Sequence, residues 1–310
     1  MREGLNIFQP VRAGCMLPSG EMSPAPPPFD LPSFDRYGDA VPRSPVVLSV
    51  PHAGRDYPPA LLAALRVPLS AATVLEDRHV DALAFAARGD ETMLVQRRAR
   101  AWIDLNRSEQ ERDPAIDEGA RATALPAPSA KVRGGLGLVP RRVNGAGELW
   151  RRRFTASEVQ ARILADHRPY HAALAETLDA TRARFGVAVL LDVHSMPSLG
   201  PGGPKVVIGD RFGRSADSRF VDAIERIVRD AAIPVARNTP YAGAHVLDTH
   251  ARGGRVHAIQ LEFDRGLYLD PAGDQPGDGL ASTAAILRVV IDALAHEAAG
   301  GRGQTAIAAE

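Results

Sequence analysis

Three widely separated apolar runs constrain the fold of this chain more than any other feature of its sequence. They are "PVVLSV" at 45–50, "VAVLLDVHS" at 187–195 and "VHAIQLEF" at 256–263. Nearly continuous apolar runs of this length are typical of strands that are buried on both faces of a sheet. The runs therefore predict a three-layer α/β fold, in which helices flank a mixed, mostly parallel β-sheet.

Helical patterns and shorter strand-like runs fill the segments between these three runs. Such an alternation is what parallel strands require, because each crossover between them needs a long connection. Helices are expected at 60–67, 78–89, 155–186, 215–232 and 281–298, and further strands at 91–97, 100–105, 204–210 and 233–238.

The long helix expected over 155–186 carries its own start and stop signals. Thr155 with Glu158 three residues later predicts a capping box, and Gly186 predicts the C-terminal cap. Pro169 cannot donate a backbone hydrogen bond, so we expect a kink or a division of the helix there.

Length and composition fit one large domain. The chain has 310 residues, 45% of them hydrophobic, which is enough for a sizeable core. We expect a single α/β domain over 41–298. Residues 1–40 contain the stretch "SPAPPPFDLPS" and are expected to form a poorly ordered, proline-rich extension, while 299–310 are expected to be a flexible tail.

The charge balance and the single cysteine indicate which binding partners and which cellular compartment to expect. Lys and Arg together number 37, as do Asp and Glu, so no net charge favours nucleic acid or an anionic membrane. The N-terminus lacks the apolar core of a secretory signal, and no apolar run predicts a membrane span. The single cysteine, Cys15, has no partner for an internal disulfide, so we predict a cytoplasmic protein in which histidines and carboxylates hold any metal.

Polar side chains stand at the ends of the expected strands, where open α/β sheets form their sites. His52 follows the first apolar run, His194 lies at the end of the second, and Glu262 lies near the end of the third. The pair Asn106-Arg107 follows another expected strand. We expect these side chains to lie at one edge of the sheet and to form a site there.

Two histidines and one carboxylate form a common set of catalytic zinc ligands, with the fourth position left for water. His52, Asp77 and His194 suit these roles, for zinc or another divalent ion. Glu262 suits the base that takes a proton from that water. Asp192, two residues before His194, is a candidate for orienting a ligand histidine.

Each of these residues also has an ordinary structural interpretation. A single histidine after a strand is more often a packing residue than a ligand. Glu76 and Asp81 compete with Asp77 for the third position, since a helix N-terminus favours carboxylates without any metal. The remaining histidines considered are expected on the surface or on helix faces: His79, His167, His171, His250 and His257.

Arginines near these positions suit an anionic substrate. Arg107 with Asn106 has the geometry to hold a carboxylate by paired hydrogen bonds, and Arg100 is a candidate for facing a developing oxyanion. The basic runs at 97–100 and 151–154 are short and lack interleaved aromatic residues, so they do not predict a nucleic-acid site.

Seven short motifs follow one another along the chain. They are "SVPHAG", "ED" at 76–77, "WIDLNR", "GLGLVP", "LLDVHS", "NTPYAGAH" and "HAIQLEFDRGLYLD". From about Val46 to Asp270, the ordered set resembles the N-formylglutamate amidohydrolase family. The resemblance implies a fold similar to that of zinc carboxypeptidases and aspartoacylases. It also implies hydrolysis of N-formyl-L-glutamate to L-glutamate and formate, a step of histidine degradation.

The resemblance also implies roles for individual residues. The implied metal ligands are His52, Asp77 and His194, with Glu262 activating water and Arg100 at the position of an oxyanion arginine. The residues implied to bind the substrate or line its pocket are Asn106, Arg107, Tyr241 and His245.

The implied substrate is a small, acidic N-acyl amino acid, whose second carboxylate needs a further cation. Arg133, Arg141 and Arg142, in the irregular segment before the long helix, are candidates among which the sequence does not choose. Arg55 stands three residues after His52, where the related carboxypeptidases have a glutamate, so the third metal ligand must come from elsewhere.

Two other functions fit the same residues. One is a zinc amidohydrolase that acts on a different N-acyl amino acid or on a small peptide. The other is a non-catalytic relative that keeps the fold and the metal and senses an acidic metabolite. The complete water-activating set, Glu262 included, argues against the second.

Overall fold

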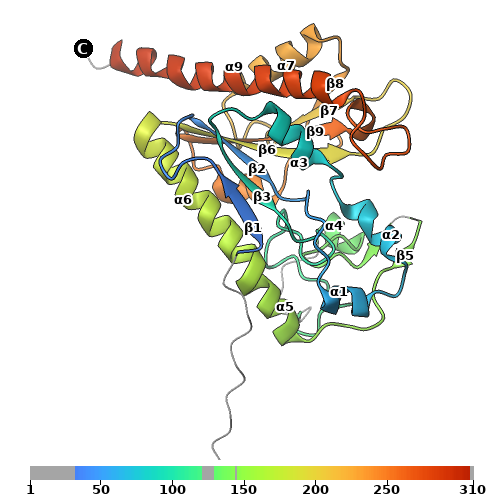
Figure 1. The fold of residues 1–310 in the computed structure, drawn as a ribbon. Coiled ribbons are helices and arrows are strands. Elements are labelled where there is room, and N and C mark those ends of the chain that lie inside the picture. The colour runs from blue at the N-terminus through green and yellow to red at the C-terminus, as the bar shows by residue number, and fades with distance from the viewer. Residues whose placement is uncertain (1–31, 121–128, 144, 308–310) are drawn as a thin grey trace, which may run out of the picture. The chain divides into compact units, whose positions relative to one another are not determined.

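A seven-stranded sheet, in the order β1-β3-β2-β6-β9-β7-β8, organises the chain (Figure 1). The computed structural model describes residues 32–120, 129–143 and 145–307, with side chains to residue 300. The strands are β1 (Phe34–Tyr37), β2 (Val46–Val50), β3 (Thr92–Gln96), β6 (Ala188–Met196), β7 (Val206–Gly209), β8 (Val235–Arg237) and β9 (Val256–Asp264).

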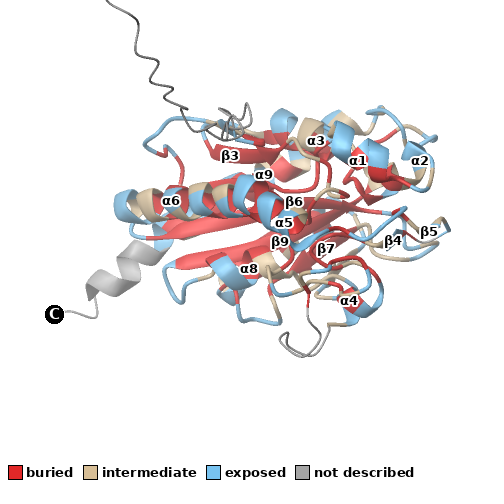
Figure 2. Cartoon of the chain, turned by 90° about the horizontal axis from the view of Figure 1, so that it is seen from below, coloured by how far each residue is buried: buried red, intermediate tan, exposed pale blue. Residues whose placement is uncertain are grey.

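The centre of the sheet is parallel. β3, β2, β6 and β9 pair in parallel, β8 pairs in parallel with β7, and β1 and β7 pair antiparallel with β3 and β9. Every residue of β2, β6 and β9 is buried, because helices cover both faces of these strands (Figure 2). The predicted α/β fold with a mixed, mostly parallel sheet is therefore confirmed.

Two hydrophobic clusters hold the helices on the two faces. Alternate strand residues enter different clusters, as Val46 and Leu48 do on one face and Val47 on the other. The first cluster includes residues of α3 (Val80–Ala87), α7 (Ser218–Asp230) and α9 (Leu280–Ile307). The second includes residues of α5 (Ala156–Arg162), α6 (Arg168–Phe185) and α8 (His245–His250).

Short elements occupy the connections. They are α1 (Pro59–Ala64), α2 (Leu69–Ala72), the 3₁₀ turns η1 (Thr73–Leu75) and η3 (Arg265–Leu267), α4 (Ala130–Arg133), and the ribbon of β4 (Arg142–Val143) and β5 (Gly147–Glu148).

The long helix has the predicted signals at both ends. Thr155 and Glu158 form the capping box at the start of α5, and Gly186 ends α6 in the left-handed conformation, with φ of 75°. A π-helical turn, η2 (Ile163–His167), separates α5 from α6. The division expected at Pro169 thus takes the form of a π turn just before the proline, where the hydrogen-bond ladder is already rearranged.

The strand predicted at 100–105 is wrong. The chain forms turns there, with a hydrogen bond from the Trp102 N–H to the Ala99 carbonyl and another from the Arg107 N–H to the Asp104 carbonyl. The Asp104 carboxylate accepts the backbone N–H of Asn106 at 2.9 Å, a local bond that replaces strand pairing.

Regular structure reaches beyond the predicted domain boundaries at 41 and 298. β1 lies within the predicted extension and pairs with β3, and α9 continues to Ile307 within the predicted tail. The remainder of the extension, 1–31, lies outside the described residues. Among the helices described, none combines the length and the apolar character needed to traverse a bilayer.

Candidate active site and metal centre

Two histidines and an aspartate meet at the carboxyl ends of neighbouring strands. His52 follows β2 after Pro51, and His194 lies near the C-terminal end of β6. Because β2 and β6 are parallel, both strands end at the same edge of the sheet. The Asp77 N–H donates to the His52 carbonyl at 3.0 Å, which holds the loop before α3 at this edge.

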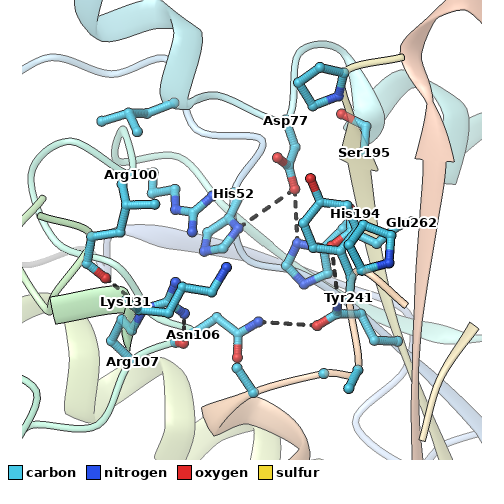
Figure 3. Close-up of a pocket in the computed structure, with 18 of the residues that line it drawn as sticks. His52, Asp77, Arg100, Asn106, Arg107, Lys131, His194, Ser195, Tyr241 and Glu262 are labelled. Atoms are coloured by element: carbon cyan, nitrogen blue, oxygen red, sulfur yellow. Dashed lines mark hydrogen bonds and ion pairs between the residues drawn. The ribbon is translucent and has the colours of Figure 1, made fainter. Parts of the chain in front are cut away.

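The three side chains surround one point (Figure 3). Asp77 Oδ2 lies 2.8 Å from His194 Nδ1 and 3.6 Å from His52 Nδ1, and the ring centroids are 4.8 Å apart. All three residues are only 2–3% exposed. The structure therefore brings together the three residues that the sequence predicts as metal ligands.

The two carboxylates that compete with Asp77 in the sequence have other partners. Glu76 accepts hydrogen bonds from Tyr57 and Arg78. Asp81 forms an ion pair with Arg55 at the start of α3. Neither belongs to the three-residue group around His52 and His194, which favours Asp77 as the third ligand.

Buried carboxylates orient both imidazoles. His52 Nε2 lies 2.7 Å from Asp104 Oδ1, and His194 Nε2 lies 2.8 Å from Asp192 Oδ2. When Nε2–H donates to a carboxylate, Nδ1 is left for a ligand, which is the usual arrangement of a metal-binding histidine. Asp192 has the orienting position expected of it, whereas Asp104 was not among the predicted residues.

The donor set fits a divalent cation. His52 Nδ1 is buried and has no hydrogen-bond partner in the part of the chain that the structure describes. Burial would lower the pKa of His194, but Asp192 and Asp77 outweigh burial and raise this pKa well above its ordinary value. A cation would replace the proton between His194 and Asp77 and would give His52 Nδ1 a partner. Two histidines and one carboxylate suit zinc with an open fourth position.

Glu262 lies beside this group on the adjacent strand β9, where it pairs in register with His194. Its side chain is buried, and burial raises the pKa of Glu262 to about 7, against the influence of the His194 imidazole. Gln260 donates a hydrogen bond to Glu262 Oε1 at 2.9 Å. A carboxyl group with a pKa near neutrality can both accept and return a proton, as a general base must.

A cavity of about 190 Å³ opens onto these residues. Arg100, Asn106, Arg107 and Tyr241 line it, as expected of residues that bind substrate (Figure 3). His245 is the exception, because it does not line the cavity. Its ring stacks instead on that of His167.

Hydrogen bonds inside the protein fix two of the cavity residues. Asn106 accepts the Val246 N–H at 2.9 Å and donates to Gln260 at 3.3 Å, so this amide joins α8 to β9. Arg107 Nε donates to the Leu136 carbonyl at 2.8 Å. The guanidinium is thus held in place at the cavity wall.

The fold and the site agree with a known family. The family model described as N-formylglutamate amidohydrolase matches residues 44–269, which include all the residues of the site described above. The chain belongs to this family. The resemblance noted in the sequence is therefore confirmed, and with it the prediction of a hydrolase that acts on amide C–N bonds.

Members of the N-formylglutamate amidohydrolase family are similar to this chain over most of their length. The N-formylglutamate deformylase of Pseudomonas aeruginosa is 29% identical over 264 residues, which cover 81% of this chain and 93% of that protein. The N-formylglutamate deformylase of Pseudomonas putida is 28% identical over 247 residues, which cover 74% and 83%.

Two solved structures share the fold of this chain. The N-formylglutamate amidohydrolase of Ralstonia eutropha JMP134 is 34% identical and superposes with a TM-score of 0.79, over 87% of this chain and 100% of that chain. A gene product of Agrobacterium tumefaciens, 20% identical with a TM-score of 0.58, shares the fold over 86% of this chain and 96% of its own.

Arg133, Arg141 and Arg142 are the candidates for binding the second substrate carboxylate, and none of them lines the cavity. Arg141 pairs with Asp113 at 2.7 Å, and Arg142 lies 3.6 Å from Glu148. Acidic residues of the same segment therefore neutralise both arginines. Arg133 is exposed. Lys131, two residues before Arg133 on α4, lines the cavity instead and was missed.

Four histidines predicted on the surface or on helix faces are buried. They are 1–9% exposed, because they pack between the sheet and the helices or against the Asn106 segment. These residues are His167, His171, His250 and His257.

Proposed function

We propose that the chain is a metal-dependent amidohydrolase that converts N-formyl-L-glutamate and water into L-glutamate and formate. The observation that carries the proposal is the group of His52, Asp77 and His194, with Glu262 beside it on the next strand. The names of the Pseudomonas relatives support the choice of substrate.

A zinc or other divalent ion held by these three ligands would polarise the formyl carbonyl and lower the pKa of a water molecule. Glu262 removes a proton from the attacking water and returns it to the departing amine nitrogen as the formyl C–N bond breaks. It lies beside His194 in the register of the two strands, which supports this role.

Arg100 stabilises the negative charge that develops on the formyl oxygen. Its Nε and Nη2 atoms lie 2.9 Å from Asp104 Oδ2, a pair that fixes the guanidinium at the cavity wall. Nη1 takes no part in this pair and is left for the substrate. Since Asp104 also binds His52, one carboxylate supports both a metal ligand and the oxyanion group.

Two cations of the cavity suit the two carboxylates of the substrate. Arg107 is held by the protein backbone, and we assign the first carboxylate to it. The Lys131 amine lies 5.9 Å from the Tyr241 ring and has neither a hydrogen bond nor an ion pair to another described residue. Partial burial of the amine at the cavity wall lowers the pKa of Lys131, and the charges of Arg107 and Arg100 act in the same direction. A substrate carboxylate would relieve this repulsion, so the second one is assigned to Lys131.

Formate release from N-formyl-L-glutamate tests the proposal, with N-acetyl- and N-succinyl-L-glutamate as competing substrates. Glu262→Gln should keep its metal and lose about 10²–10³-fold or more in kcat, the scale of losing a key catalytic group. Glu176→Gln is the matched control, because Glu176 is exposed on α6.

Three outcomes would contradict parts of the proposal. Retained activity in Glu262→Gln would remove Glu262 as the base. Faster turnover of an acetyl or succinyl substrate would show that the enzyme prefers to remove that acyl group instead of the formyl group. Stabilisation by N-formylglutamate without any turnover would point to a binding protein.

A further inference from the structure

A second group of histidines lies behind the segment that carries Asn106 and Arg107. His167 of η2, His171 of α6 and His245 of α8 each offer one ring nitrogen, and these atoms lie within 4.8 Å of one another. The ring centroids are 4.5–5.5 Å apart. We call these three residues the second histidine cluster, and the proposed mechanism makes no use of them.

Two rings of the second histidine cluster are oriented as metal ligands usually are. His167 Nε2 lies 2.8 Å from the Arg107 carbonyl, and His171 Nε2 lies 2.9 Å from the Leu105 carbonyl. A carbonyl oxygen only accepts, so each Nε2 carries the hydrogen and each neutral ring keeps a lone pair on Nδ1. Donation from one ring nitrogen to a backbone carbonyl is the common support of a ligand histidine.

His167 supplies an unpartnered polar atom inside the cluster. The residue is 3% exposed, and its Nδ1 has no hydrogen-bond partner among the described residues. The nearest carboxylate oxygen, Glu109 Oε1, lies 3.9 Å from this Nδ1. An unprotonated, buried nitrogen without a partner fits a cation better than it fits an apolar core.

The other nitrogens are also in a state that can bind a metal. Burial lowers the pKa of His171 well below its ordinary value and that of His245 to about 4, so both rings are neutral at pH 7. His171 Nδ1 lies 2.9 Å from His250 Nε2, whose N–H it accepts. A cation at this Nδ1 would displace the His250 hydrogen bond.

We propose that His167, His171 and His245 bind a second divalent transition-metal ion, of the zinc class. Three neutral imidazoles suit zinc and its neighbours and do not suit magnesium or calcium, which prefer oxygen ligands. A water molecule completes the coordination, because both oxygens of Glu109 are bonded to Arg168. Because two of the ligands also hold the carbonyls of Leu105 and Arg107, the ion fixes the segment that presents Asn106 and Arg107 to the cavity.

Metal counting on the tag-free full chain tests this site without any activity measurement. Protein saturated with zinc and then desalted should contain two ions per chain. His194→Ala should contain one, which reports the second histidine cluster with all its residues intact. His245→Gln should also contain one, and the variant with both substitutions none. His296→Gln, which removes an exposed histidine of α9, should keep two.

The same zinc counts can contradict the proposed second metal site. A His194→Ala chain with no ion, with one ion in the wild type, would show that the second histidine cluster holds no metal. Two ions retained in His245→Gln would place the second ion elsewhere. Circular dichroism confirms that each variant is folded, and because formate is not measured, a wrong substrate assignment leaves this test unaffected.

Discussion

At the scale of single residues, the protonation of buried side chains decides which atoms face a ligand. Burial would raise the pKa of Asp104, but Arg100 and Arg107 outweigh burial and hold this pKa well below its ordinary value. The ionised carboxylate then accepts from His52 Nε2 and from the Asn106 N–H. Asp104 thereby directs His52 Nδ1 toward Asp77.

We call the proposed metal site of His52, Asp77 and His194 the Asp77 centre. Asp104→Asn should weaken zinc binding at this centre by about 10–100-fold, the usual effect of losing a carboxylate behind a ligand histidine. Competition with a chromogenic chelator measures this affinity, in a His245→Gln background that leaves only this centre. Asp81→Asn is the control, since Asp81 pairs with Arg55 and does not contact the ligands. Equal zinc affinities in the two variants would show that Asp104 does not orient His52.

Lys131 is expected to recognise charge on the substrate. Lys131→Met should lower kcat/KM for N-formyl-L-glutamate by about 10–100-fold, the effect of losing a hydrogen bond between charged groups. The same substitution should change the value for N-formyl-L-methionine little, because that substrate has one carboxylate. Arg142→Met is the control, since Arg142 is exposed outside the cavity lining. An equal loss for both substrates would assign Lys131 a role other than binding the second carboxylate.

At the scale of elements, local sequence predicts what depends on neighbours in the chain. Apolar runs identify β2, β6 and β9, and the polar residues at their ends identify His52, His194 and Glu262. Local sequence does not identify Asp104 and Lys131, because their roles depend on residues that are far away in the sequence. The apolar residues of "WIDL" suggest a strand, but the Asp104 side chain stabilises a turn, and no periodicity reveals that preference.

His257, beneath the start of α7, should make stability depend on pH. Burial lowers its pKa, and its Nδ1 accepts the Asp217 N–H at 3.3 Å. A histidine with a folded pKa below its unfolded pKa of about 6.5 takes up a proton more readily when unfolded. Its contribution is therefore complete above pH 6.5 and is lost as the pH falls below that value.

Urea unfolding of metal-free protein between pH 7 and pH 5 measures this effect. In His257→Gln, the free energy of unfolding should fall less steeply with decreasing pH than in the wild type, by at most about 1.4 kcal/mol per pH unit for one proton. The exposed His296→Gln should follow the wild-type slope. Identical slopes in all three proteins would mean that His257 protonates equally in the folded and unfolded states.

At the scale of the whole molecule, the Asp77 centre joins parts of the chain that are far apart in sequence. His52 follows β2, Asp77 precedes α3 and His194 belongs to β6, so the three proposed ligands come together only when the sheet has formed. An ion bound at this centre therefore belongs to the folded state, and its binding free energy adds to the free energy of unfolding.

Above its dissociation constant, each such ion should raise the free energy of unfolding by about 1.4 kcal/mol for every tenfold increase in free zinc. Urea unfolding at a series of buffered zinc concentrations gives this slope. His194→Ala should lower the wild-type slope by the contribution of one ion, and adding His245→Gln should remove the rest. Because His194 donates to Asp192 within the core, the absolute stability of the variant will also change, so the slope is the quantity that decides. An unchanged slope in His194→Ala would mean that the stabilising metal binds somewhere other than beside Asp77.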